Sequence, residues 1–346
     1  MKRTVKLILL VILVMPAFSV CYGQSQTDAI AENMLVYQRS YGGWPKALDA
    51  KKVDYNKVLT DKEKKEIAAT ADNDDATIDN KATSREIVYL TKAWAQTKNQ
   101  QYLDAARKGI DYVLKAQYSN GGWPQYYPDK KFYRAEITYN DDAMVNVLNI
   151  LLDIAHQAGD YAVLGNEYAK KAQTAVDKGV ACILKTQYSW NGHPTAWAAQ
   201  YDQHQLLPAK ARAYELPSLA SSESGNIVKF LMRIENPSPE IKTAITSAMD
   251  WFEQTKITGF KTARIEAPAE ASGKDVVLVT DPSSVIWARF YDLQHMQPLF
   301  CGRDGVPKTK LAEIDNERRT GYAWYGAWPK QLLEQDYPAW KNKWMK

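Results

Sequence analysis

A helical segment recurs along the chain, and this repetition limits the folds that the chain can adopt. Residues 109–118 match residues 179–188 without gaps, the same register returns at 249–252, and residues 35–44 resemble residues 114–123. One such helix cannot bury its apolar face alone, so neighbouring copies must stack against one another. The sequence therefore predicts a repetitive helical protein, either an open solenoid or a closed α/α toroid.

Further helices are predicted between the copies. Apolar residues return at intervals of three and four positions within residues 87–94, 144–154 and 227–234, which is the spacing of an amphipathic helix face. About three helix pairs result, joined by long loops rich in Gly, Trp, Pro and Tyr. We therefore predict a mainly α fold, an (α/α)3-like toroid whose long loops and few strands form a substrate cleft. Residues 276–279 are predicted as a short strand and residues 283–295 as another helix.

The N-terminus has the pattern of a secretory signal peptide. Lys2, Arg3 and Lys6 precede or border an apolar run at residues 7–14, and small residues follow near residue 23. We expect residues 1–23 to be removed and the chain to be exported, either to the periplasm or out of the cell. No linker rich in Ser, Pro or Gly divides residues 24–346, so they are predicted to form a single domain. No later run reaches the roughly 20 apolar residues of a membrane span, so no membrane contact is expected after signal removal.

Charge and composition argue against several classes of function. The net charge of +4 falls further when the basic signal residues are removed, and a near-neutral chain is not expected to bind nucleic acid. Cys182 and Cys301 remain, which leaves one bridge or two free thiols open, and four His without a Cys/His cluster give little support for zinc. The 11 Trp and 21 Tyr suit sugar rings as well as a core. No sequence feature signals a partner subunit, so we expect a monomer.

Two clusters of oxygen-bearing side chains stand at the starts of predicted helices. Residues 72–80 include Asp79 and Asn80, and residues 138–142 include Asp141 and Asp142. Helix N-termini carry partial positive charge and free amide groups, so some of these residues can be simple caps. The clusters hold more carboxylates and amides than capping needs, and Ca²⁺ accepts such ligands in flexible geometry. Capping and calcium binding are therefore the two interpretations.

The sequence Gly-Gly-Trp-Pro follows two of the helix copies, at residues 42–45 and 121–124. Glycine allows backbone conformations that other residues avoid, and proline fixes the exit from the loop. The tryptophan can be buried behind the helix end or can offer its face to a sugar, and both can hold at once. Trp123, and Lys46 directly after the first loop, are accordingly candidates for substrate binding.

Several arginines in the C-terminal half of the chain are candidates for binding an anionic ligand. Arg212, Arg289, Arg303, Arg318 and Arg319 all lie in motif-like surroundings. The planar guanidinium group matches a carboxylate with two parallel hydrogen bonds, although each of these arginines can also belong to a structural ion pair. Together with a calcium site and many aromatic residues, they indicate an anionic polysaccharide as the ligand.

These motifs resemble those of the pectate lyases of polysaccharide lyase family 10. The resemblance rests on residues 72–80, 137–144, 211–218 and 303–305, which occur in the family's order and cover nearly the whole mature chain. It implies an α/α toroid-like fold and one catalytic domain over residues 24–346. It also implies an extracytoplasmic enzyme that cleaves α-1,4-linked polygalacturonate (pectate) by Ca²⁺-assisted β-elimination, which gives 4,5-unsaturated oligogalacturonates.

The resemblance also implies roles for individual residues. Asp79 and Asp141 would lie at the catalytic Ca²⁺ with Asp142 and Asn80 beside them, Arg212 would be the Brønsted base, and Arg289 and Arg303 would hold substrate carboxylates. Removal of the proton next to a uronate carboxylate builds negative charge on that carboxylate, which calcium and arginine both stabilise. A guanidinium group is effectively always protonated, so Arg212 must either have a strongly perturbed pKa or act through hydroxide.

Two other functions fit the same residues. A glycoside hydrolase on an α/α toroid would use paired carboxylates, with Asp141 or Asp142 as base and Glu223 or Asp79 as acid. A non-catalytic protein would use the same calcium, tryptophan and arginine groups only to bind uronates. Product chemistry separates these alternatives, because elimination leaves an ultraviolet-absorbing double bond and hydrolysis does not.

Overall fold

The computed structural model describes residues 27–345. The predicted signal peptide, residues 1–23, lies outside the described residues. Within residues 27–345, none of the helices is long and apolar enough to cross a membrane.

The repeated segments form helices, as the sequence predicts. The four copies belong to α1 (Ala29–Tyr37), α4 (Gln100–Ala116), α6 (Gly165–Thr186) and α8 (Pro239–Thr255). The predicted intervening helices are α3 (Ser84–Thr97), α5 (Ala143–Ala155) and α7 (Ser221–Met232). They pack as the pairs α3–α4, α5–α6 and α7–α8. A short helix α2 (Asp61–Ala68) precedes α3.

A glutamine at the end of each of the first three copies joins that copy to the next. The side-chain amide of Gln38 donates to the carbonyl of its own loop and to a carbonyl of α4, and Gln117 and Gln187 repeat the arrangement toward α6 and α8. The donor–acceptor distances lie between 2.8 and 3.0 Å. The copies are therefore connected in series, each to its successor.

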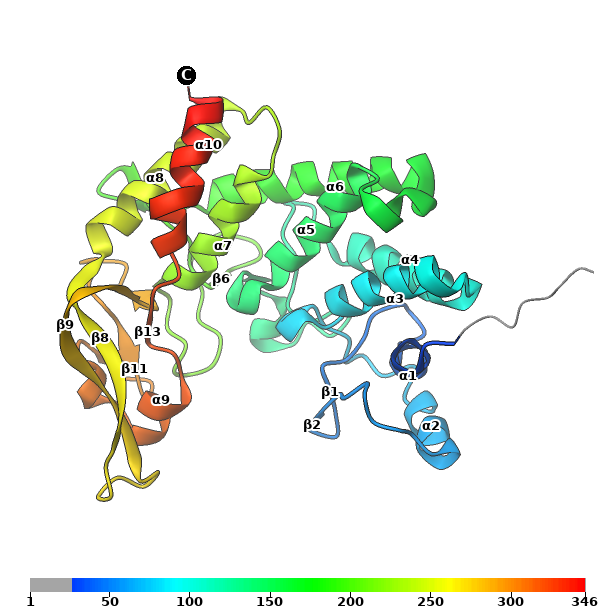
Figure 1. The fold of residues 1–346 in the computed structure, drawn as a ribbon, viewed down its shortest axis with the longest axis horizontal. Coiled ribbons are helices and arrows are strands. Elements are labelled where there is room, and N and C mark those ends of the chain that lie inside the picture. Colours follow the sequence, from blue (N-terminus) through cyan, green and yellow to red (C-terminus); the bar gives the residue numbers. More distant parts are fainter. Residues whose placement is uncertain (1–26, 346) are drawn as a thin grey trace, which may run out of the picture.

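The predicted toroid is wrong, because this series stays open. In Figure 1, α1 and α8 lie at opposite ends of the helical part, so the last copy does not return to the first. Instead, α8 packs against α10 (Tyr337–Trp344), where the Tyr337 hydroxyl donates to Thr246 at 3.3 Å. Closure depends on how much each repeat rotates relative to the one before, and the sequence of a single repeat does not specify that rotation.

A long β-ribbon follows α8. Strands β8 (Ile257–Glu266) and β9 (Lys274–Ala288) pair antiparallel, and β13 (Tyr325–Gly326) joins β9 on its other side. The strand predicted at 276–279 lies within β9, but the helix predicted at 283–295 is wrong. There, Val285 and Ile286 pair with Thr258 and Ile257 of β8, and this long-range pairing suits β-branched residues.

Short strands and one further helix complete the described chain. The pairs are β1 (Ala47–Leu48) with β2 (Lys51–Lys52), β3 (Ile137–Thr138) with β6 (Gln200–Tyr201), β4 (Ser189–Trp190) with β5 (His193–Pro194), β7 (Leu219–Ala220) with β10 (Phe290–Tyr291), and β11 (Phe300–Cys301) with β12 (Pro307–Lys308). Helix α9 (Asn316–Gly321) lies beside β9.

Buried tryptophans anchor the chain that follows each helix copy. Trp44, Trp123, Trp197 and Trp287 are fully buried, and each indole N–H donates at 2.8 Å to a carbonyl of the preceding helix copy. Trp123 therefore packs in the core and offers no face to a sugar, so the prediction that it contacts substrate is corrected in favour of burial. The glycine that begins the repeated segment makes room for this packing, since a Cβ on Gly109 would lie 2.7 Å from the Trp44 ring.

Candidate active site

Three of the buried tryptophans accept backbone hydrogen bonds from the segments that precede α3, α5 and α7. The Trp44 carbonyl accepts the amide of Thr77 at 3.1 Å, and the Trp123 carbonyl accepts that of Thr138 at 3.2 Å. The Trp197 carbonyl accepts the amide of Ala220 at 2.8 Å. The same backbone hydrogen bond thus positions both predicted acidic clusters at equivalent places in successive repeats. It also positions a third segment, which precedes α7, at the equivalent place.

Unusual backbone conformations occur in both turns that precede α3 and α5. Asn80 and Lys81 have φ angles of 51° and 64°, and Asp141 and Asp142 have φ angles of 52° and 59°. Left-handed conformations cost roughly 1–2 kcal/mol for each residue with a Cβ, so such pairs are typical of functional sites. Neither α3 nor α5 receives a side-chain hydrogen bond from its N-cap residue. The capping interpretation therefore does not account for these acids.

The three helix ends surround one open cavity of 300 Å³. It is lined by Asn80, Lys81, Asp141, Asp142, Ser222, Glu223 and Arg289. The turns that hold Asp79 and Asp141, residues 79–81 and 140–142, contact each other directly. The structure thus brings together the predicted residues Asp79, Asn80, Asp141, Asp142 and Arg289 from widely separated parts of the sequence.

Asp79 is almost completely buried, with an exposed fraction of 2%. Its Oδ2 forms an ion pair with Lys46, while its Oδ1 is shielded from solvent and has no hydrogen-bond donor. Burial alone would lower the pKa of Lys46, but the charge of Asp79 and its hydrogen bond raise it on balance. Lys46, predicted to bind substrate, therefore lies next to a predicted calcium ligand.

The carboxyl groups that line the cavity hold their protons more tightly than usual. Burial raises the pKa of Asp141, and the charge of Asp79 adds to the rise while Arg289 opposes it. Burial likewise raises the pKa of Asp142, against the hydrogen bond from Asn226 and the charge of Arg289. These shifts mean that the carboxylates are costly to ionise in this arrangement.

Glu223 and Arg289 form an ion pair at the α7 side of the cavity. Burial raises the pKa of Glu223, which Arg289 opposes and Asp142 reinforces. The sequence makes Glu223 a candidate only in the hydrolase alternative, as the acid. No local motif marks it, because α7 lacks the acidic run that precedes α3 and α5, and only the fold places it beside them.

The donor set of the cavity suits a hard cation. It offers carboxylate and amide oxygens, and a divalent cation would satisfy the bare Oδ1 of Asp79 and relieve the repulsion between the carboxylates. Within residues 27–345, no three His, Cys, Asp or Glu side chains are close enough to form a metal site on their own. The residues therefore fit Ca²⁺ best where a ligand supplies further oxygens.

Arg212 lies on an exposed loop and is held by Glu215. The guanidinium group contacts both carboxylate oxygens, with 2.9 Å between Arg212 Nε and Glu215 Oε2. These hydrogen bonds raise the pKa of Arg212 further above its ordinary high value. A small cavity lined by Asn140, Tyr214 and Glu215 places this loop next to the second acidic cluster.

Aromatic side chains connect the Arg212 loop to the cavity. The Tyr214 ring lies 5.0 Å from the guanidinium carbon of Arg212 and 4.6 Å from that of Arg303, whose side chain also pairs with Glu317. Burial raises the pKa of Tyr322, which Arg289 opposes, and the charges of Asp141 and Glu215 add to the rise. Tyr322 therefore lies between the acidic cavity and the Arg212 loop.

Family comparison identifies the chain. The sequence profile of the pectic acid lyase family matches residues 38–333. The chain belongs to the pectic acid lyase family. The predicted membership of polysaccharide lyase family 10, and the prediction that the chain is a pectate lyase, are confirmed.

Solved structures agree with this membership. The chain is similar to a family 10 polysaccharide lyase from Cellvibrio cellulosa, with 33% identity, a TM-score of 0.77, and coverage of 89% of this chain and 91% of the other. An aspartate-to-alanine mutant of that enzyme, solved in complex with trigalacturonic acid, matches with 34% identity, a TM-score of 0.78, and coverage of 89% and 92%. No curated protein sequence matches the chain.

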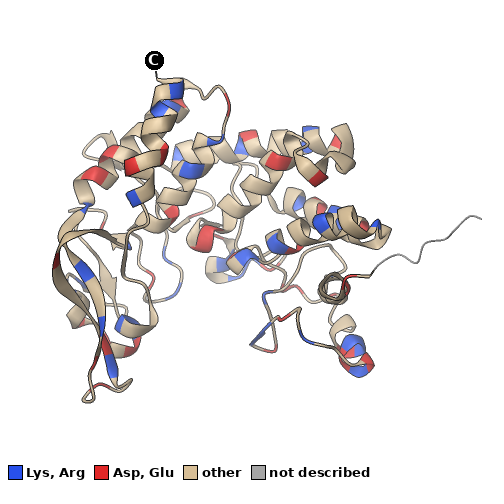
Figure 2. Cartoon of the chain, viewed as in Figure 1, with Lys and Arg blue, Asp and Glu red and all other residues tan. Residues whose placement is uncertain are grey.

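Charges of both signs surround the site of this pectate lyase. In Figure 2, acidic and basic residues are interspersed over the helices and the ribbon alike. In this view, neither sign of charge gathers on one extended face.

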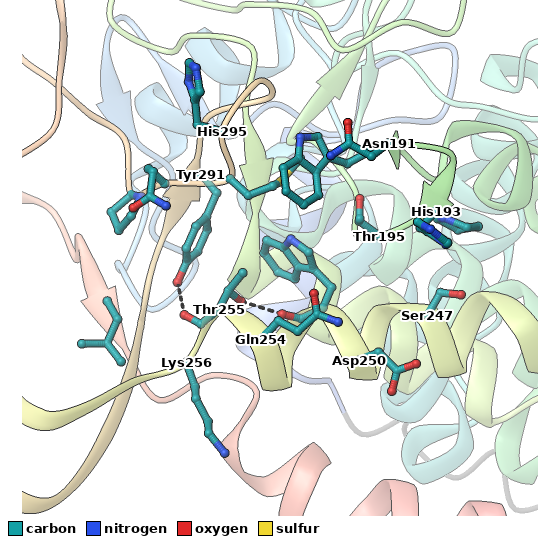
Figure 3. Close-up of a pocket in the computed structure, with 17 residues that line it drawn as sticks. Asn191, His193, Thr195, Ser247, Asp250, Gln254, Thr255, Lys256, Tyr291 and His295 are labelled. Carbon is teal, nitrogen blue, oxygen red and sulfur yellow. Dashed lines mark hydrogen bonds between the residues drawn. The ribbon is translucent and has the colours of Figure 1, made fainter.

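A second, larger cavity lies elsewhere on the pectate lyase. It has a volume of 980 Å³ and is formed by the β4–β5 hairpin, the C-terminal half of α8 and residues 291–298. Figure 3 shows His193, Asp250, Gln254 and His295 around it. None of the predicted site residues lines this cavity, so the acidic cavity remains the candidate active site.

Proposed function

We propose that this pectate lyase cleaves α-1,4-linked polygalacturonate by Ca²⁺-assisted β-elimination. The observation that carries the proposal is that Asn80, Asp141 and the Glu223–Arg289 ion pair line one open cavity, where the turn that holds Asp79 contacts the turn that holds Asp141. The similar lyase from Cellvibrio cellulosa in complex with trigalacturonic acid supports the choice of substrate. The products are expected to be oligogalacturonates with a 4,5-unsaturated end.

Asp79, Asn80, Asp141 and Asp142 are the residues that would hold the cation. Bound there beside a uronate carboxylate, Ca²⁺ would stabilise the negative charge that develops on that carboxylate. Arg289, which also lines the cavity, contributes a positive charge; burial alone would lower its pKa, but the charge of Glu223 raises it on balance. Because Arg289 lines the cavity and its Nε has no acceptor, it has donor capacity left for the same carboxylate.

Lys46 and Arg303 extend substrate binding away from the cavity. Lys46 can exchange its partner Asp79 for a uronate carboxylate when a cation takes over the charge of Asp79. Arg303 is exposed and forms two hydrogen bonds with Glu317, at 3.0 and 2.8 Å. Exposed pairs of this kind contribute little stability, so a polyanionic ligand can displace them at small cost.

Arg212 is the proposed Brønsted base. In the reaction, the proton on C5 of a galacturonate unit is removed and a double bond forms between C4 and C5. The C4–O bond breaks, and its oxygen leaves with the other part of the chain and takes a proton from water. The pairing with Glu215 keeps Arg212 protonated, so it must leave Glu215 before it can take the proton, or it must position a hydroxide that does so. Both routes favour alkaline pH, where neutral guanidine and hydroxide are less scarce.

Product analysis tests the proposed function directly. We expect polygalacturonate incubated with the enzyme and Ca²⁺ to gain ultraviolet absorbance together with shorter chains, more at alkaline than at neutral pH. A chelator should stop both changes, and added Ca²⁺ should restore them. Chain shortening without absorbance would instead indicate hydrolysis by paired carboxylates, and binding without shortening would indicate a non-catalytic protein.

A further inference from the structure

One loop conformation occurs twice, after the third and the fourth buried tryptophan. Residues 201–208 and residues 291–298 both begin with Tyr-Asp and end with Pro. In each loop the aspartate amide donates at 2.9 Å to the carbonyl five residues later, and the residue before that carbonyl is left-handed, with φ angles of 58° and 56°. Because the two loops share one shape, a difference in their surroundings must come from the segments that pack against them.

The segment that packs against the first loop is a tight glycine turn after α4. The side-chain amide of Asn120 in this turn donates to the carbonyl of Gln203 at 2.8 Å. A Cβ on Gly121 would lie only 1.9 Å from the carbonyl oxygen of Lys178 in α6. The turn therefore lies directly on the next helix copy.

The segment that packs against the second loop, after α6, is the β4–β5 hairpin instead. Asn191 and Gly192 form its two-residue turn, with φ angles of 50° and 79°, as is usual for a tight hairpin. A Cβ on Gly192 would meet no atom within 4 Å, so the hairpin tip stands free. The 980 Å³ cavity lies between this hairpin, α8 and residues 291–298. The departure from the repeat thus creates the cavity.

Hydrogen bonds hold two walls of this cavity together. The Tyr188 hydroxyl donates to the carbonyl of Leu293 at 3.1 Å, and the Trp190 indole N–H donates to the carbonyl of Gln294 at 2.8 Å. The carboxylate of Asp292 accepts three backbone amides of its own loop, at 2.7 to 2.9 Å. The cavity is therefore pre-organised, which lowers the entropic cost of binding a ligand.

The lining combines aromatic surface with uncharged polar side chains. Trp190, which is half-buried, and Trp251 both line the cavity. Figure 3 shows Asn191 on the hairpin and Gln254 on α8 among the polar side chains around it. Tryptophan offers a flat apolar surface, and amide groups both donate and accept hydrogen bonds, as sugar hydroxyls do. This combination suits a sugar chain.

Charge distinguishes this cavity from the acidic one. Asp250 supplies the one carboxylate and Lys256 the one ammonium group of its lining, and no arginine is among the described residues that line it. The two charges cancel, so a chain with a carboxylate on each sugar would gain no net attraction here. The lining therefore favours an uncharged ligand.

We propose that the cavity between the β4–β5 hairpin and α8 binds a neutral oligosaccharide, separately from the polygalacturonate cleaved at the acidic cavity. Trp190 supplies the surface on which a sugar ring packs, and Asn191 and Gln254 bind its hydroxyl groups. Binding here holds the enzyme on a material that contains neutral and uronate chains together, while the acidic cavity stays free. The inference does not depend on the proposed reaction, because the residues that line the two cavities are different.

Calorimetry with β-1,4-galactotetraose and with cellotetraose, two neutral tetrasaccharides that differ in the configuration at C4, tests the site. We expect at least one to bind with a Kd of about 10 mM or tighter, and saturating trigalacturonic acid to leave this binding unchanged. Trp190→Ala should weaken it roughly 10-fold or more, since a lost aromatic anchor is costly. Gln254→Ala should weaken it roughly 2- to 10-fold through a lost hydrogen bond.

Trp94→Ala is the matched control for Trp190→Ala. Trp94 is also half-buried, but it lies on α3, where Lys98 packs over its ring at 4.5 Å, and it does not line the cavity. Its removal should leave the affinity for neutral tetrasaccharides unchanged. Trp190→Ala and Gln254→Ala should both keep the wild-type rate on polygalacturonate, because neither residue lines the acidic cavity.

The proposal is overturned if neither tetrasaccharide binds at concentrations up to about 10 mM, or if folded Trp190→Ala and Gln254→Ala bind as the wild type does. Should Trp190→Ala not fold, Gln254→Ala decides alone, since Gln254 is exposed on α8. Competition by trigalacturonic acid would place the neutral sugar in the acidic cavity and would also contradict the proposal. Neutral-sugar binding through Trp190 in an enzyme that forms no unsaturated product would refute the proposed function and support this inference.

Discussion

Replacing Arg212 by alanine is expected to lower kcat on polygalacturonate by roughly 10³-fold or more, because a lost proton-transfer group costs about 10²- to 10⁴-fold. Arg212 is exposed and packs only on its own loop, so the substitution should not disturb the fold. The affinity for trigalacturonic acid should stay within a few-fold of the wild type, since other groups hold the substrate carboxylates. Initial rates followed by ultraviolet absorbance, with calorimetry for binding, measure the two effects separately.

Glu215→Gln is the matched variant for this prediction. It keeps Arg212 but removes the carboxylate whose hydrogen bonds raise the Arg212 pKa. If Arg212 must lose a proton or bind hydroxide, the alkaline rise in kcat should move to lower pH in Glu215→Gln. Substantial residual turnover in Arg212→Ala would rule out the base role, and an unshifted pH profile in Glu215→Gln would show that Glu215 does not control it.

Replacing Asp79 by alanine is expected to lower turnover by roughly 10²- to 10³-fold, without recovery at ordinary calcium concentrations. The reason is that Asp79 is buried, has a free Oδ1, and meets Asp141 across the two turns. Rates measured across a calcium titration test this. Alanine also removes the ion-pair partner of Lys46. Asp79→Asn therefore serves as a second variant, because it keeps the size of the side chain.

Asp74→Ala is the matched control for Asp79. Asp74 belongs to the same acidic run, but it is exposed and lies outside the turn, residues 79–81, that contacts the turn of Asp141. Its neighbour Asp75 pairs with the buried Arg39. The Asp74 variant should keep the calcium response of the wild type. Calcium rescue of Asp79→Ala to wild-type rates at ordinary concentrations would remove Asp79 from the proposed calcium site.

Local patterns in the sequence predicted much of the helical part. The repeat at residues 109–118 and 179–188 predicts the helix copies because each copy carries its own apolar face and its own loop signal. The open arrangement of the repeats and the β-ribbon were not predicted, because both depend on contacts between distant parts of the chain. Within residues 283–295, the end of β9 pairs with β8, and β10 pairs with β7. The local spacing of apolar residues does not indicate such long-range strand pairing.

The residues of the candidate site were also predictable only in part. Asp79 and Asp141 could be found because each lies in a dense acidic run before a helix. Glu223 stands apart from the acidic runs, so only the fold reveals that it joins the cavity. Trp123 was ambiguous, because a Gly-Gly-Trp-Pro loop looks the same whether its indole is buried or exposed.

Calcium calorimetry in the presence of trigalacturonic acid tests the central claim, that Asp79 and Asp141 join with a substrate carboxylate in holding one cation. The Arg212→Ala background prevents cleavage, and Asp79→Ala or Asp74→Ala is added to it. We expect trigalacturonic acid to tighten Ca²⁺ binding in Arg212→Ala and in the Asp74 double variant, and to lose this effect in the Asp79 double variant. Equal, ligand-enhanced Ca²⁺ affinity in all three proteins would contradict the account.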